Sequence, residues 1–182
     1  QFLTAAGTSL LLSACITTRR GYNTASYESV AQSELIASSY RAADALTAQA
    51  GAQLSAQHPV IVATLVNINA LEESSPLGRL ISEQVGARMA QGGYRVAELK
   101  IRQKLYMKRS EGELMLTREI KDIARQQDAQ ALVIGTYTEG ADRVFINMKL
   151  IQIETNLTLA AVDYALPLDM NIRALLYRPA PT

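Results

Sequence analysis

The sequence ALVIGTYTEGADRVFINMKLI, residues 131–151, predicts two β-strands in succession. Its first part, residues 131–137, is a nearly continuous run of apolar and β-branched residues, typical of a strand buried on both faces. Residues 140–142 (GAD) then predict a hairpin turn. From residue 144 to residue 150, apolar residues alternate with Phe145, Asn147 and Lys149, which predicts a strand with one core face and one mixed face.

A third strand follows directly. Residues 154–156 (ETN) predict another turn, and residues 157–166 form the last strand, which Pro167 ends. Three consecutive strands joined by short turns predict an antiparallel meander. Beyond it, Ile172, Leu175 and Leu176 indicate one short helix.

The preceding part of the chain predicts a strand-helix-strand unit. Residues 60–66 (VIVATLV) form an apolar run expected of a central strand. Ser75 caps the following helix and Pro76 takes its first position. Gly92 and Gly93 end this helix, and residues 94–99 form the next strand. The core stripe of the helix consists of Leu77, Leu80, Ile81, Val85 and Met89.

The remaining segments add helices. Residues 29–55 predict a helix, with one face formed by Ile36, Tyr40, Ala43, Ala50 and Leu54. Residues 100–115 predict a short strand or an extended arm, and Thr117 is a candidate helix cap. The predicted fold class is therefore α/β: a mixed sheet of about five strands with helices packed on it, in a single domain at residues 29–178.

Composition excludes several protein classes. The chain has 182 residues, of which 48% are hydrophobic and 19% charged, so it is neither disordered nor a multi-span membrane protein. Its net charge of +1 gives no reason to expect nucleic acid as a partner. One Cys excludes an intramolecular disulfide, and a lone Cys in an exported chain needs another role.

The N-terminus supplies that role. An apolar stretch that is too short to span a bilayer ends in Leu12-Ser13-Ala14-Cys15, which resembles a bacterial lipobox. We therefore expect residues 1–15 to be a signal peptide with its lipobox, the Cys15 thiol to carry lipid, and residues 16–28 to be a linker. The alternative is an apolar helix with a buried Cys. Because Ile16 and not Asp follows the Cys, sorting of the enterobacterial kind would deliver the protein to the outer membrane. The start lacks Met and a basic region, so we expect residues upstream of Gln1.

Catalytic motifs are sparse. His58, the only His, precedes a strand-opening Pro, and no Gly-x-Ser-x-Gly motif accompanies it, so we interpret it as a loop-edge residue. Gly135 and Gly140 have phosphate-loop spacing, but Lys-Ser or Lys-Thr does not follow them. We therefore predict no enzyme, no metal, and no cofactor other than the covalent N-terminal lipid.

Two charged segments are candidate interaction patches. Glu72 and Glu73 form an acidic pair in a loop, where carboxylates are usually just solvated. The segment 100–109 is basic and has Tyr106 within it. We interpret it as a solvated edge or a contact to an acidic partner subunit. Its charged residues are Lys100, Arg102, Lys104, Lys108 and Arg109.

Several phrases of the sequence resemble the FlgO family of flagellar outer-membrane proteins, over roughly residues 35–178. They are residues 75–84 (SPLGRLISEQ), 93–98 (GYRVAE), 132–137 (LVIGTY), 142–147 (DRVFIN) and 161–164 (AVDY). The domain is also similar in outline to the periplasmic domains of TolB and of the curli secretion channel CsgG.

This resemblance implies a non-enzymatic outer-membrane lipoprotein whose domain faces the periplasm. It would help to build a ring around the flagellar basal body, in contact with the membrane, with copies of itself and with other flagellar ring proteins. Head-to-tail contacts in such a ring need two different patches, for which the acidic and basic segments are candidates. The alternative is an accessory lipoprotein of a secretion or surface-fibre system. An envelope hydrolase would need a polar cluster around His58.

Overall fold

The computed structural model describes residues 33–71, 73–97 and 118–177 of the chain. Several predicted features lie outside these residues: the lipid-attachment residue Cys15, the linker 16–28, Glu72 of the acidic pair, the basic segment 100–109 and the helix cap Thr117.

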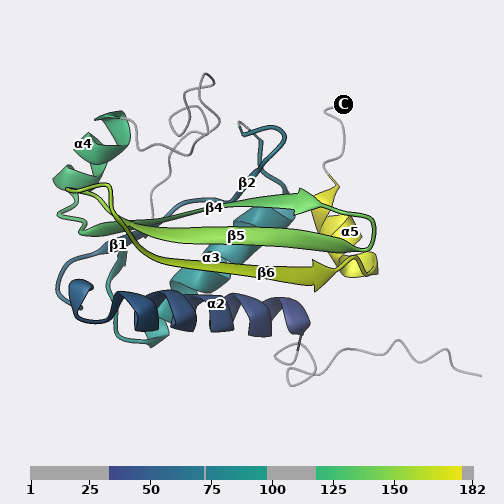
Figure 1. The fold of residues 1–182 in the computed structure, drawn as a ribbon, viewed down its shortest axis with the longest axis horizontal. Coiled ribbons are helices and arrows are strands. Elements are labelled where there is room, and N and C mark those ends of the chain that lie inside the picture. Colours follow the sequence, from purple (N-terminus) through teal and green to yellow (C-terminus); the bar gives the residue numbers. More distant parts are fainter. Residues whose placement is uncertain (1–32, 72, 98–117, 178–182) are drawn as a thin grey trace, which may run out of the picture.

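Within the described residues, six strands form one mixed sheet in the order β3-β1-β4-β5-β6, with β2 beside β4 (Figure 1). β1, β2 and β3 run parallel to their neighbours, whereas β4, β5 and β6 pair antiparallel. This confirms the predicted mixed sheet and its C-terminal meander. The strands are β1 (Val60–Val62), β2 (Val66–Asn67), β3 (Val96–Ala97), β4 (Ala131–Glu139), β5 (Arg143–Gln152) and β6 (Thr158–Pro167).

Helices cover the sheet unequally. α2 (Glu34–Ala50), α3 (Pro76–Gln91) and α5 (Met170–Leu176) pack on one face, here called the inner face, and enclose the main core (Figure 1). On the outer face, a smaller cluster forms where Ala124 of α4 (Arg118–Gln126) packs with Ile61 and Leu132. Farther along the outer face, Phe145 of β5 is 52% exposed.

The predicted strand 60–66 is wrong as a single element, because it divides into β1 and β2. The break is caused by hydrogen bonds of Leu65. Its N–H donates to Ser82 Oγ at 2.9 Å, and its carbonyl accepts from Ser74 Oγ at 2.7 Å. Both serines are buried, and Ser82 itself donates to the Gly78 carbonyl at 2.9 Å. Side chains around α3 therefore replace the sheet partners that a continuous strand would use.

Replacing Ser82 with alanine should lower the free energy of unfolding by about 2 kcal/mol, because the buried Leu65 N–H loses its only hydrogen-bond acceptor among the described residues. Chemical denaturation of the two proteins measures the difference. Ser55→Ala, at an exposed position, is the matched control and should change stability by less than about 0.5 kcal/mol. Equal losses for both variants would contradict the role given to Ser82.

The helix predicted at residues 29–55 ends earlier than expected, and its first residues, 29–32, lie outside the described part of the chain. Of its predicted buried face, Ala43, Ala50 and Leu54 are buried, whereas Ile36 and Tyr40 are only partly buried. α2 ends at Ala50, because Gly51 adopts a positive φ of 50°, and a 3-10 turn (Gly51–Gln53) follows. Tyr40 lies on the flank of the helix, 5.5 Å from the Arg88 guanidinium. Small residues allow α2 to approach the sheet closely, a preference that hydrophobic periodicity alone does not detect. Its buried residues are Leu35, Ser38, Ser39, Ala42, Ala43, Leu46 and Ala50.

The start and end of α3 agree with the prediction. The Ser75 hydroxyl accepts a hydrogen bond from the Gly78 N–H at 3.2 Å, and Pro76 occupies the first turn. Gly92 caps the other end, and Gly93 has a φ of 87° that other residues rarely adopt. Arg88 holds α3 to α2 through two hydrogen bonds to the Asp44 carboxylate, at 2.8 and 2.9 Å.

Candidate functional site

Of the predicted patch residues, the structure describes Glu73. Its side chain is exposed in the loop that joins β2 to α3. The loop is held by backbone hydrogen bonds, in which Asn67 N–H donates to the Glu73 carbonyl at 2.9 Å and Glu73 N–H donates to the Ala70 carbonyl at 2.7 Å. Glu73 is thus placed on a fixed surface turn beside β2. The other predicted patch residues lie outside the described part of the chain, so the pairing of the two patches stays a prediction.

His58 lies on the surface, just before β1. Its Nδ1 atom is 2.9 Å from Asp128 Oδ2, and both side chains are at least half exposed. Exposed pairs of this kind contribute little to stability. Across residues 33–71, 73–97 and 118–177, no group of three His, Cys, Asp or Glu side chains is arranged to hold a metal ion. Gly135 lies within β4 and Gly140 in the turn after it, so neither begins a helix.

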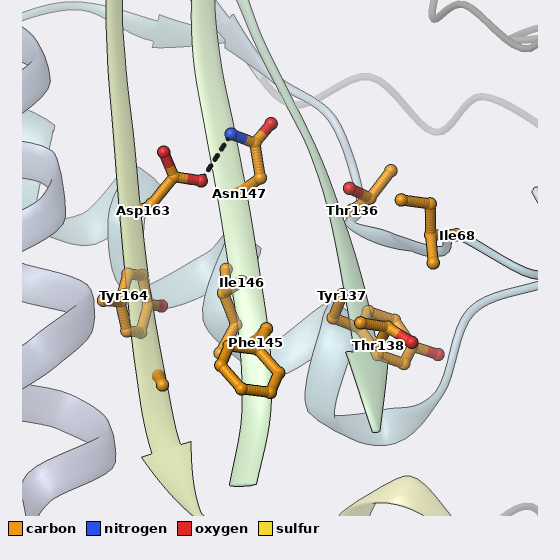
Figure 2. Close-up of a pocket in the computed structure, with 10 residues that line it drawn as sticks. Ile68, Thr136, Tyr137, Thr138, Phe145, Ile146, Asn147, Asp163 and Tyr164 are labelled. Atoms are coloured by element: carbon orange, nitrogen blue, oxygen red, sulfur yellow. Dashed lines mark hydrogen bonds between the residues drawn. The ribbon is translucent and has the colours of Figure 1, made fainter. Parts of the chain in front are cut away.

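The outer face of the sheet carries a shallow pocket of about 380 Å³, here called the outer-face pocket (Figure 2). It lies over the last part of β4 and the adjoining parts of β5 and β6, next to the end of β2. The side chains that matter for its chemistry are Ile68, Thr136, Thr138, Phe145, Asn147 and Asp163.

A polar pair lines one end of this pocket (Figure 2). Asn147 and Asp163 are directly opposite each other in the β5–β6 register. Asn147 Nδ2 donates to Asp163 Oδ1 at 2.7 Å (Figure 2). Two cross-strand neighbours locked together in this way present their remaining oxygens and N–H group in a fixed arrangement.

An apolar surface borders this pair. Phe145, two residues before Asn147 on β5, points to the same face of the sheet and is 52% exposed. Its ring packs against Gly140, where an added Cβ would lie 2.9 Å from Phe145 Cε2. Ile68, which follows β2, is also 52% exposed and lines the same pocket. Sequence reasoning classified the alternate residues of β5 as a mixed face, but it missed the pocket because Asp163 and Ile68 join it only through the sheet register.

Tyr164 follows Asp163 on β6, but its side chain packs against the main core on the inner face, and its buried hydroxyl has no hydrogen-bond partner in the described structure. Burial raises the pKa of Tyr164 from 10.0 to about 12. The nearby Ser39 hydroxyl donates to the Leu35 carbonyl at 2.9 Å in this structure, and it would offset a smaller part of the rise by donating to the ionised tyrosine instead. A tyrosine whose pKa is higher in the folded state stabilises the fold below pH 10, and this contribution is lost as pH rises from 10 through 12.

Replacing Tyr164 with phenylalanine should therefore reduce the loss of stability between pH 10 and 12. At neutral pH the variant should be as stable as the parent or up to about 1 kcal/mol more stable, because it removes an unpaired buried hydroxyl. Denaturation curves recorded across this pH range measure both effects. Tyr177→Phe, at a residue that is 70% exposed, is the control and should follow the parent. A neutral-pH loss above about 1 kcal/mol would mean that the hydroxyl is paired.

One protein-family model matches most of the chain. The FlgO protein family model matches residues 40–171, from within α2 to the start of α5. The chain belongs to the FlgO family. The matched region contains the whole described sheet and the outer-face pocket. No curated protein matches the chain by sequence.

Several solved structures are similar to this chain at low sequence identity. The C-terminal domain of LpoB from Escherichia coli has a TM-score of 0.51 and 13% identity, covering 73% of this chain and 98% of that one. A PelC dodecamer from Paraburkholderia phytofirmans has a TM-score of 0.44 and 14% identity, covering 63% of this chain and 75% of that one. Lipoprotein GNA1162 from Neisseria meningitidis has a TM-score of 0.41 and 12% identity, covering 63% of this chain and 82% of that one. At this identity the likeness to LpoB shows a shared fold.

Two of the phrases that resemble the FlgO family have structural roles. In residues 75–84, Ser75 caps α3, Gly78 lets the helix approach Leu65, and Ser82 bonds the Leu65 N–H. In residues 142–147, Phe145 and Asn147 build the outer-face pocket. Of the helices in the described part of the chain, none has the length and apolar character needed to cross a membrane.

Proposed function

We propose that this FlgO-family protein is a lipid-anchored structural subunit of a ring that surrounds the flagellar basal body at the outer membrane and is needed for motility. The observation that carries the proposal is the family match over residues 40–171. A flagellar role, ring formation and contacts with other flagellar ring proteins are what the family resemblance implies for this chain.

The proposed anchor is the lipobox at residues 12–15. One acyl chain binds a membrane only marginally, whereas several chains attached to one Cys anchor a protein stably. Lipid on Cys15, followed by Ile16 and the linker 16–28, would hold the domain on the periplasmic side of the outer membrane. The domain would then act as a tethered assembly module.

The proposal includes neither catalysis nor nucleic-acid binding. It is supported by the chemistry of the outer-face pocket, where the described lining residues supply hydroxyl, amide, carboxylate and aromatic groups but no His, Cys or Lys. Such groups suit recognition, since nucleophilic catalysis needs an activated nucleophile beside a base. His58, the only imidazole of the chain, is separate from this pocket and pairs with Asp128.

Contacts between copies would close a ring if two different patches meet head to tail. The acidic loop at Glu72 and Glu73, and the basic segment with Lys100, Arg102, Lys104, Lys108 and Arg109, remain the proposed pair. A Glu73→Lys protein and a Lys104→Glu protein should each assemble poorly alone and better when mixed, as measured by sedimentation. Assembly of the mixture that is no better than that of either single variant would discount this pairing.

Deletion of the protein tests the functional proposal. The deletion strain should lose swimming in soft agar, and the wild-type chain supplied in trans should restore it. A strain that swims normally but fails to export a surface polypeptide would favour the secretion-accessory alternative. Normal swimming and normal export would contradict both functions.

A further inference from the structure

The outer-face pocket brings together two of the large apolar side chains that are exposed in the described structure. Phe145 lies on β5 and Ile68 follows the end of β2, and each side chain is 52% exposed. Single exposed apolar residues are ordinary, whereas two that line one hollow beside fixed polar groups are typical of a binding site. On β6, the residue opposite Phe145 is Ala165, whose small side chain leaves open space next to the ring.

The hydrogen-bonding groups beside the Phe145 ring are complementary to two neighbouring hydroxyl groups of a ligand. Once Asn147 Nδ2 has donated to Asp163 Oδ1, the second Asp163 oxygen and the Asn147 oxygen still accept hydrogen bonds, and one amide N–H still donates. Neighbouring hydroxyl groups on a sugar ring each donate and accept at similar spacing. The same ring also has an apolar C–H face that packs against an aromatic side chain.

Charge narrows the choice of ligand. Asp163 is the only lining residue, among those described, that carries a formal charge at neutral pH, and no described side chain forms an ion pair with it. The unpaired carboxylate disfavours a polyanion such as nucleic acid. Its open oxygen and the free groups of Asn147 form hydrogen bonds, which suit a ligand that is neutral and rich in hydroxyl groups.

The pocket volume agrees with such a ligand. About 380 Å³ is within the range of small-molecule sites, and the hollow lies on an open sheet face where a polymer could continue past it. We propose that the outer-face pocket binds a glycan strand, with one sugar ring on Phe145 and its hydroxyl groups on Asn147 and Asp163. This inference goes beyond the proposed flagellar function and does not depend on it.

The test is calorimetric titration of the full chain, purified in detergent, with cellotetraose, a β-1,4-linked oligomer of glucose in which every ring keeps adjacent 2- and 3-hydroxyl groups. We expect saturable binding. Phe145→Ala and Asp163→Asn should each weaken it about tenfold or more, since each removes a partner that the ligand needs. Because both side chains are on the surface, the variants should keep the thermal unfolding midpoint of the parent.

Matched controls separate this site from general surface effects. Tyr177→Ala removes an aromatic ring that is 70% exposed elsewhere, and Asp142→Asn removes an exposed carboxylate from the β4–β5 turn. Both should bind cellotetraose like the parent. The proposal is overturned if the parent shows no saturable binding up to about 10 mM ligand. It is also overturned if Phe145→Ala and Asp163→Asn bind as tightly as the parent. Either result leaves the flagellar proposal intact, because motility tests that proposal separately.

Discussion

Replacing Gly78 with alanine is expected to lower the free energy of unfolding by about 3 kcal/mol. An added Cβ would lie 2.5 Å from the Leu65 carbonyl oxygen, 2.8 Å from Ser74 Oγ and 2.9 Å from Tyr137 Cε1. α3 would have to move away from β2, which would strain the hydrogen bonds of Leu65 with Ser74 and Ser82.

The same helix provides the control for this change. An added Cβ at Gly86 would lie 3.5 Å from Val96 Cγ1 and 3.8 Å from Val62 Cγ2, which is ordinary van der Waals contact. Since alanine favours a helix interior over glycine, Gly86→Ala should leave stability unchanged or raise it by up to about 1 kcal/mol. Chemical denaturation distinguishes the two. Similar losses for Gly78→Ala and Gly86→Ala would contradict the close approach of α3 to Leu65.

Replacing Cys15 with alanine should remove the protein from the outer-membrane fraction and abolish its labelling by fatty acid. The physical reason is that the domain would lose the acyl chains proposed to hold it at the bilayer. The measurement combines labelled palmitate incorporation with separation of the inner and outer membranes by density.

A second substitution distinguishes lipidation from sorting. Ile16→Asp keeps the Cys but introduces the residue that retains enterobacterial lipoproteins in the inner membrane. This variant should still incorporate palmitate, but it should fractionate with the inner membrane instead of the outer membrane. A Cys15→Ala protein that still fractionates with the outer membrane would show that something other than the proposed lipid anchors the chain.

Much of the fold could be predicted because its signals are local. The alternation through Phe145, Asn147 and Lys149 indicated the mixed face of β5, and the turns at residues 140–142 and 154–156 indicated the meander. The Ser75-Pro76 start of α3 was also correct, because a cap is defined by residues next to each other in sequence.

The errors arose where distant side chains decide the local structure. The division of residues 60–66 into β1 and β2 depends on Ser74 and Ser82, which bond Leu65 from beyond the strand. α2 buries Ser38 and Ser39 where periodicity favoured Ile36 and Tyr40, because close packing on the sheet requires small side chains. The outer-face pocket depends on the register between β5 and β6, which places Asp163 opposite Asn147.

Electron cryotomography of flagellar basal bodies tests the proposed ring role most directly. The deletion strain should lack a ring next to the outer membrane, and the wild-type chain should restore it. The Cys15→Ala chain, supplied at equal abundance, should leave the ring absent. A complete set of rings in the deletion strain would contradict the proposal that this FlgO-family protein is a structural subunit of the basal body.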